Sequence, residues 1–262
     1  MKTLIYITTI GLALSCAKAH DFALTPGMGE EGKIAVSGLY GHPGTWEQPD
    51  IRRLVALDVH AVGESHPTSI LDSVKPSTAG NLRLAASGDK PVKAAGVIIT
   101  ATYDNGYWVS TGESQYFNTT KKMAPAGLDI VKSSHNTKFA KLMLENGPGF
   151  DRSVGQRLEI VPQNDPAKLA KGEELVVQVL FDGKPLAGVE VNSAALDESM
   201  SHDEENLPKT DGAGKVRIDV AKTGMNLIRA SHSVESVDPE LADHDNFSAT
   251  LVLRFGPAPS RP

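Results

Sequence analysis

The feature that most constrains the fold is the regular alternation of short β-branched or apolar segments with clusters of glycine, proline, asparagine and aspartate. The segments cover residues 34–39, 54–62, 82–84, 97–103, 154–162, 174–181, 189–191, 216–220, 225–230 and 248–255. β-Branched residues favour strands, and the clusters between them are typical of turns. The sequence therefore predicts a mainly β protein, with antiparallel pairing in its first half.

Two segments are expected to interrupt the strands. Asp104, Asn105 and Gly106 form a turn signal of the hairpin type, which leads into a strand at residues 107–109. Residues 132–146 contain neither glycine nor proline, and we expect them to form the one helical or irregular connector.

The turn cluster at residues 163–166 is the expected domain boundary. It separates an N-terminal β domain, residues 20–165, from a C-terminal β-sandwich, residues 166–256, in which short strands alternate with turns. Residues 197–205 are predicted to form a solvated acidic loop, and residues 257–262 a frayed tail.

The chain begins with the parts of a secretory signal peptide. Met1 and Lys2 precede an apolar run at residues 4–14, and a small-x-small cleavage site ends at Ala19. Cleavage there makes the protein an exported, periplasmic one that begins at His20. No later apolar run is long enough to cross a bilayer, so no membrane insertion is expected. The competing interpretation is lipidation at Cys16, which would leave His20 without a free amine.

Composition narrows the chemistry that is available. Cys16 is the only cysteine, so the chain from His20 onward has no thiolate ligand, disulfide or cysteine nucleophile. Loss of Lys2 and Lys18 with the signal leaves 24 basic against 32 acidic residues, a net charge of −8. This acidic balance argues against nucleic acid as a partner and is compatible with cations.

The eight histidines are therefore the main candidates for binding a transition metal. His20 would offer an imidazole and a free α-amine on one residue; the alternative is a ring that simply points into solvent after cleavage. His42 lies between glycines and a proline, and His232 is at the end of a strand. His244 stands between two aspartates that could bind its second ring nitrogen.

The other four histidines, His60, His66, His135 and His202, are expected to be packed strand residues or solvent-exposed. We find no Gly-x-Ser-x-Gly elbow, phosphate-binding glycine loop or His-Glu-x-x-His motif. The sequence is accordingly interpreted as that of a non-enzyme.

Several motifs resemble those of the domain of unknown function 4198 family, whose members are described as periplasmic components associated with nickel or cobalt uptake. The matching segments are residues 20–22, 41–43, 154–162, 165–166, 183–189, 210–216 and 248–251. Many members carry an aromatic residue near the closing strand, where this chain has residues 243–247. The resemblance implies two β-sandwich-like domains, the second one immunoglobulin-like, of the carboxypeptidase-regulatory or Cna-B-like kind.

The resemblance also implies metal handling. The first hypothesis is a periplasmic protein that binds a divalent transition metal through His20, His42, His232 or His244, and delivers it to an inner-membrane transporter. Nickel or cobalt is favoured by the resemblance, and histidine and carboxylate ligands permit zinc or copper. The alternatives are a β-sandwich module that binds a protein or a glycan, and a copper redox protein in which an N-terminal histidine and a second imidazole hold the metal.

Overall fold

The computed structural model describes residues 20–27, 34–76, 84–87, 96–112, 115–196 and 206–257. The predicted signal peptide, the acidic loop at residues 197–205 and most of the predicted tail lie outside these residues. Strands dominate the described chain, and its only helical segments are four short 3₁₀ turns, η1 to η4. The predicted mainly β fold class is confirmed. None of the helices in the described residues has the length and apolarity needed to cross a membrane.

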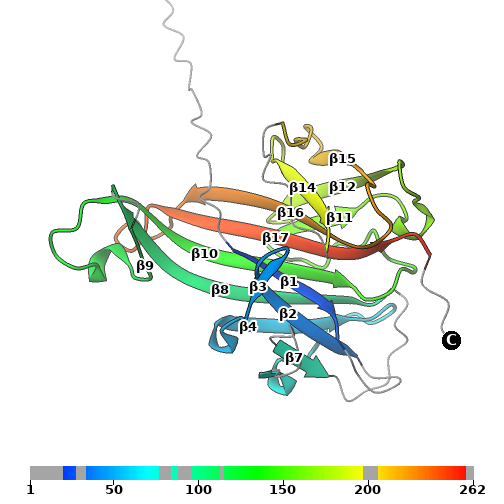
Figure 1. The fold of residues 1–262 in the computed structure, drawn as a ribbon, viewed down its shortest axis with the longest axis horizontal. Helices are drawn as coiled ribbons and strands as arrows, with labels where there is room; N and C mark the ends of the chain where they lie inside the picture. Colours follow the sequence, from blue (N-terminus) through cyan, green and yellow to red (C-terminus); the bar gives the residue numbers. More distant parts are fainter. Residues whose placement is uncertain are drawn as a thin grey trace, which may run out of the picture.

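One large sheet forms the centre of the molecule, in the order β14-β16-β17-β10-β8-β4-β5, with β9 paired to β8. Its strands are β4 (Leu54–His60), β5 (Thr68–Ser69), β8 (Ile98–Thr111), β9 (Tyr116–Phe117), β10 (Ile130–Met143), β14 (Val191–Ala195), β16 (Gly224–Glu235) and β17 (His244–Phe255). The pairing of β10 with β17 is parallel, whereas the other pairs are antiparallel. Figure 1 shows the long strands β8, β10, β16 and β17 running across the whole molecule.

Two smaller sheets cover opposite faces of the central sheet. The first contains β1 (Asp21–Pro26), β2 (Ala35–His42), β3 (Thr45–Glu47), β6 (Lys75–Pro76) and β7 (Leu84–Ser87). The second contains β11 (Leu158–Pro162), β12 (Glu174–Phe181), β13 (Lys184–Pro185) and β15 (Lys215–Asp219). The protein thus consists of two β-sandwiches that share one central sheet, and the predicted β-sandwich architecture is confirmed.

The side chains of each central strand divide between two cores, because successive residues of a strand point to opposite faces. On β10, Ala140 and Leu142 belong to the core beneath β1 and β2, whereas Phe139 and Met143 belong to the core beneath β11 and β12. The predicted boundary at residues 163–166 remains a prediction, and the central sheet contains strands from both sides of it.

An ion pair is buried between the central sheet and the second small sheet. Lys141 of β10 donates to Glu159 of β11, and both side chains are almost inaccessible to solvent. Glu159 also accepts hydrogen bonds from Ser153 Oγ (2.7 Å), Val154 N (2.8 Å) and Gly155 N (3.0 Å). These contacts satisfy a charge that would otherwise be costly to bury.

The prediction that two segments interrupt the strands is wrong, because both segments lie within long strands. Asp104, Asn105 and Gly106 lie within the continuous strand β8, where a register shift against β10 accommodates the positive φ of 75° at Gly106. This is a β-bulge rather than a hairpin turn. Residues 132–146 lie mostly in β10, a 14-residue strand at the centre of the sheet. The absence of glycine and proline there reflects a long strand, not a helix.

Candidate metal-binding site

The antiparallel register of β1 and β2 brings two of the four candidate histidines together. Asp21 pairs with Gly41 and Phe22 with Tyr40. Continuing this register by one residue places His20 opposite His42. Side chains in such cross-strand positions have their Cβ atoms about 4.5–5.5 Å apart, so they contact each other directly.

The rings of His20 and His42 are 5.1 Å apart between centroids and nearly perpendicular, at 89°. Two imidazoles that bind one metal at about 2.0–2.1 Å keep their centroids within roughly 6 Å of each other, so the observed separation is within reach of a shared ion. Both side chains are half-buried, which leaves the site open to solvent.

Gly41 allows the strand to approach its neighbour at this point. Its φ is +123°, and a Cβ atom added there would lie 2.8 Å from the carbonyl oxygen of Thr45. Only glycine combines this backbone conformation with so close an approach. His42 is therefore placed by the end of β2, not by a separate loop as the sequence suggested.

Three contacts fix the start of β1 on the central sheet. Lys138 Nζ donates to the carbonyl oxygen of His20. Thr250 Oγ1 donates to the carbonyl oxygen of Phe22 at 2.7 Å. The buried Asp21 carboxylate forms an ion pair with Arg229 at 3.4 Å. The N-terminal end of β1 is thus held by side chains from β10, β16 and β17.

Asp21 is a carboxylate whose charge interacts with that of His42. Burial raises its pKa, and the positive charges of Arg229, Lys138 and His42 oppose that rise. Because Arg229 pairs with it, we regard Asp21 as an anchor of β1 and not as a metal ligand.

Tyr40 forms the aromatic wall of the site. Its ring is 5.0 Å from that of His20 at an angle of 76°, and its hydroxyl donates to Asn105 Oδ1 at 2.9 Å. Burial raises the pKa of Tyr40. Its hydroxyl therefore stays protonated at neutral pH and acts as a hydrogen-bond donor.

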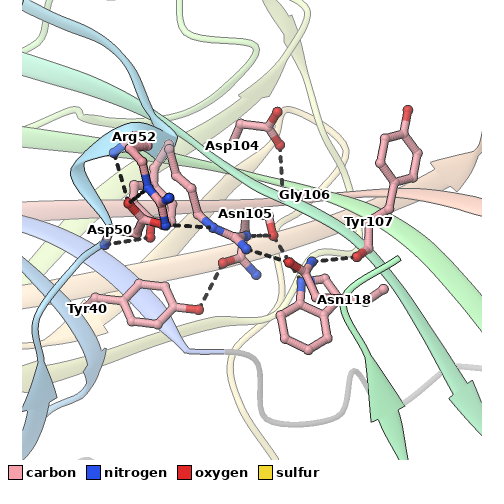
Figure 2. Close-up of polar contacts among 11 residues, drawn as sticks. Tyr40, Asp50, Arg52, Asp104, Asn105, Gly106, Tyr107 and Asn118 are labelled. Atoms are coloured by element: carbon pink, nitrogen blue, oxygen red, sulfur yellow. Dashed lines mark hydrogen bonds and ion pairs between the residues drawn. The ribbon is translucent and has the colours of Figure 1, made fainter. Parts of the chain in front are cut away.

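A polar network supports Tyr40 from the bulge of β8, as Figure 2 shows. The carbonyl oxygen of Asn105 accepts from Arg53 and from Trp108 Nε1, the latter at 3.0 Å. Arg53 also donates to Asn118 Oδ1 at 2.6 Å. These contacts fix the orientation of the Tyr40 ring, and His20 packs against that ring.

The described residues offer this site two imidazoles, but no group of three or more His, Cys, Asp or Glu side chains arranged to hold a metal. A third nitrogen is available if the chain begins at His20, since the α-amine then lies on a residue that already supplies an imidazole. The resulting ligand set is two imidazoles and one amine, which suits nickel, copper, zinc or cobalt.

The other two candidate histidines lie away from this pair. His232 contacts Phe181 at 4.7 Å between ring centroids, which places it on the opposite face of the central sheet. Burial lowers its pKa. His244 shares the face of His20, but its register partner Ser134 is four residues from Lys138, about 13 Å along the strand. A single ion therefore cannot reach all four residues.

The remaining described histidines have their own environments. His66 is exposed, as predicted. His60 Nε2 lies 3.0 Å from Thr100 Oγ1, in agreement with a packed strand residue. His135 was expected in solvent but contacts Asp104 at 2.9 Å and stacks on Tyr107 at 4.4 Å. That expectation is wrong, because it followed from the connector wrongly predicted there. His202 lies outside the described residues.

Sequence reasoning missed Tyr40 and Asp21, although both are neighbours of chosen residues. The signal that could have identified them is the pairing of the strand that follows His20 with the strand that ends at His42. With that register, Tyr40 falls opposite Phe22 and Asp21 opposite Gly41.

Comparison with known families decides the affiliation of the chain. The family model described as "Domain of unknown function (DUF4198)" matches residues 17–234, a span that includes His20 and His42. The chain belongs to the DUF4198 family. The family resemblance noted in the sequence is thereby confirmed. The match does not test the association with nickel or cobalt.

Other comparisons add little to the DUF4198 affiliation. No curated protein matches the sequence. Among solved structures, the chain is similar to the D0-D1 domain of Intimin, with 13% identity over 90% of this chain and 97% of that one, and a TM-score of 0.21. A TM-score this low does not define a common fold.

Proposed function

We propose that this DUF4198 protein is an exported protein that binds a divalent transition metal through His20 and His42. The observation that carries the proposal is the cross-strand pairing of the two histidines, with their rings 5.1 Å apart and accessible to solvent. The α-amine of His20 is the third ligand once the chain has been cleaved after Ala19. His232 and His244 have no part in this site.

Metal handling in the periplasm is the role that follows. The protein would acquire or buffer the ion and pass it to an inner-membrane uptake system. The family resemblance favours nickel or cobalt as the cargo. A half-exposed site with two side-chain ligands supports delivery, because an ion held at the surface can be transferred to a second set of ligands without unfolding of the protein.

Copper is the second candidate, and the nitrogen-rich ligand set favours it. For a given set of nitrogen ligands, affinity rises from cobalt through nickel to copper, and copper(II) prefers the tetragonal geometry that three nitrogens can begin to form. A protein that binds copper here could buffer it or use its redox chemistry.

Calorimetric titration of the metal-free protein with nickel, cobalt, copper and zinc tests the proposal. We expect one equivalent to bind, and we expect His42→Ala to weaken binding by at least roughly 10–100-fold, the loss typical of an outer-shell partner, because His42 is here a direct ligand. His232→Ala is the matched control and should leave the affinity unchanged. Failure of all four metals to bind, or equal effects of both substitutions, would contradict the proposal.

A further inference from the structure

A solvent-accessible part of the central sheet continues from the histidine pair. Figure 1 shows β8, β10, β16 and β17 extending well beyond β1 toward the left of the view. We call the surface next to His20 the open face; it consists of Trp108, Ser134, Asn136, Ser231, Ser233 and Asn246. All six side chains are half-buried or exposed.

Strand alternation assigns these residues to the same face as the start of β1. Ser134 and Asn136 are separated by even steps from Lys138, which donates to His20. Asn246 stands in the same relation to Thr250, which donates to the carbonyl oxygen of Phe22. The open face and the histidine pair therefore form one continuous surface.

Hydrogen bonds join the polar side chains of the open face into a row across three strands. Ser233 Oγ donates to Asn246 Oδ1 at 2.7 Å, and Asn246 Nδ2 donates to Asn136 Oδ1 at 3.1 Å. Asn136 Nδ2 then donates to Ser134 Oγ at 3.0 Å. Each amide orientation is set by its neighbours, so the remaining donors and acceptors are presented in fixed directions.

Trp108 supplies a flat apolar element at the end of this surface. It pairs with Ser134 in the register of β8 and β10. Its indole nitrogen is fixed at 3.0 Å from the carbonyl oxygen of Asn105, the residue that also holds the Tyr40 hydroxyl. The plane of the indole is therefore set by the same network that supports the metal site.

The chemistry of the open face excludes most kinds of partner. Its six side chains are uncharged. The same strand alternation places Lys132, Glu235 and His244 at its edge, and Lys138 and Arg229 between it and the histidine pair. The chain as a whole has a net charge of −6, so a polyanion such as nucleic acid would be repelled. A protein partner would require an apolar centre, whereas this surface is mostly amides and hydroxyls. Its backbone groups are already paired within the sheet, which rules out addition of a further strand at this place.

We propose that the open face binds an uncharged polysaccharide. Sugar hydroxyls match serine and asparagine as both donors and acceptors, and the apolar face of a sugar ring packs on an indole as other apolar groups do. The row of amides and hydroxyls itself carries no charge, so an uncharged ligand bound along it loses no hydration of a charge there. The bound chain lies beside His20 and His42, within reach of any metal held there.

Depletion of the purified protein from solution by insoluble cellulose, chitin or starch tests this proposal. We expect binding to at least one of them, and expect Trp108→Ala or the pair Asn136→Ala and Asn246→Ala to weaken it roughly tenfold, from the loss of one or two net contacts. Arg217→Ala, on β15 of the second small sheet, is the control and should bind like the unaltered protein. Circular dichroism checks that each variant is folded.

Two further experiments distinguish polysaccharide binding at the open face from metal binding at the histidine pair. Repetition in the presence of a chelator should leave binding intact, so loss of metal binding and loss of polysaccharide binding are independent results. A soluble anionic polysaccharide should not compete. The proposal is overturned if none of the three uncharged polysaccharides binds, if the open-face variants bind as well as the control, or if the anionic chain binds best.

Discussion

Gly41 is the residue on which the position of His42 depends most. It has a φ of +123°, and an added Cβ would lie 2.8 Å from the Thr45 carbonyl oxygen. The residue before His42 therefore cannot carry a side chain unless β3 moves away from β2.

Replacement of Gly41 by alanine tests this dependence. We expect Gly41→Ala to lower the free energy of unfolding by about 1–3 kcal/mol, as for other strained backbone positions. We also expect weaker metal binding, because His42 moves relative to His20. Chemical denaturation measures the stability, and metal titration measures the affinity.

The control is Gly63→Ala, which has a positive φ of 85° but no atom within 4 Å of an added Cβ. This substitution should reduce the stability and leave the metal affinity unchanged. Unchanged metal affinity in Gly41→Ala would show that the close approach does not position His42.

Residue patterns predicted part of this site and could not predict the rest. His20 and His42 were identifiable from the cleavage motif and from the Gly-His-Pro sequence. Their convergence depends on which strands pair and in what register, and a shift of one residue would turn every side chain to the other face. His232 and His244 were also candidates, because strand alternation does not reveal which face of a sheet the neighbouring sheet will cover.

At the scale of elements, the buried pair of Lys141 and Glu159 joins the central sheet to β11. The segment predicted to be a helical or irregular connector contains Lys138 and Lys141, yet both are buried and each contacts a distant segment. Their partners lie 118 and 18 residues away in sequence. Local pattern reasoning therefore predicted the wrong element, because the compensating groups were not local.

Breaking this pair should be costly. Lys141→Met leaves the Glu159 carboxylate uncompensated, and we expect a loss of about 3–5 kcal/mol in the free energy of unfolding, as for other buried pairs that lose one partner. The double variant Lys141→Met with Glu159→Gln should be more stable than the single variant, since it removes the orphaned charge. Urea denaturation at neutral pH gives both values. A double variant that is less stable than Lys141→Met would contradict this account.

The same pair predicts how stability responds to acid. Burial alone would raise the pKa of Glu159, but Lys141 and the hydrogen bonds from Val154 and Ser153 outweigh it and lower the pKa below its ordinary value of 4.5. The folded state thus binds a proton less readily than the unfolded state. The contribution of Glu159 is present above pH 4.5 and is lost as the pH falls through the lowered pKa.

Denaturation at a series of pH values measures this effect. We expect the free energy of unfolding to fall more steeply below pH 4.5 in the unaltered protein than in Lys141→Met with Glu159→Gln, which lacks the titrating carboxylate. Parallel curves for the two proteins would mean that Glu159 does not titrate with a lowered pKa.

At the scale of the whole molecule, the central sheet joins segments from both sides of the predicted boundary. The parallel pairing of β10 with β17 runs from Ser134 to Leu142 on one strand and from His244 to Val252 on the other. Phe139 and Met143 of β10 belong to the same core as β11, β12 and β16. The strand pattern predicted the sandwich architecture. It could not show the shared sheet, which depends on pairing between strands about 110 residues apart.

This arrangement predicts that residues 166–256 do not fold alone. Without β10, the strand β17 loses its parallel neighbour and the core loses Phe139 and Met143. Exposure of such apolar area is expected to cost several kcal/mol, comparable to the whole stability of a small domain. Circular dichroism and thermal unfolding of the fragment test this expectation. A cooperative transition like that of the full protein would instead establish an independent C-terminal domain.

The central claim is that His20 and His42 bind a transition metal together with the α-amine of His20. The most direct test compares two proteins by calorimetric titration with nickel and copper: one that begins at His20, verified by mass spectrometry, and one with a single extra alanine before it. We predict that the first binds one equivalent and that the second binds at least roughly 10–100-fold more weakly, because its amine is removed from the imidazole pair. Equal affinities in the two proteins would contradict the role of the terminus, and no binding in either would contradict the site.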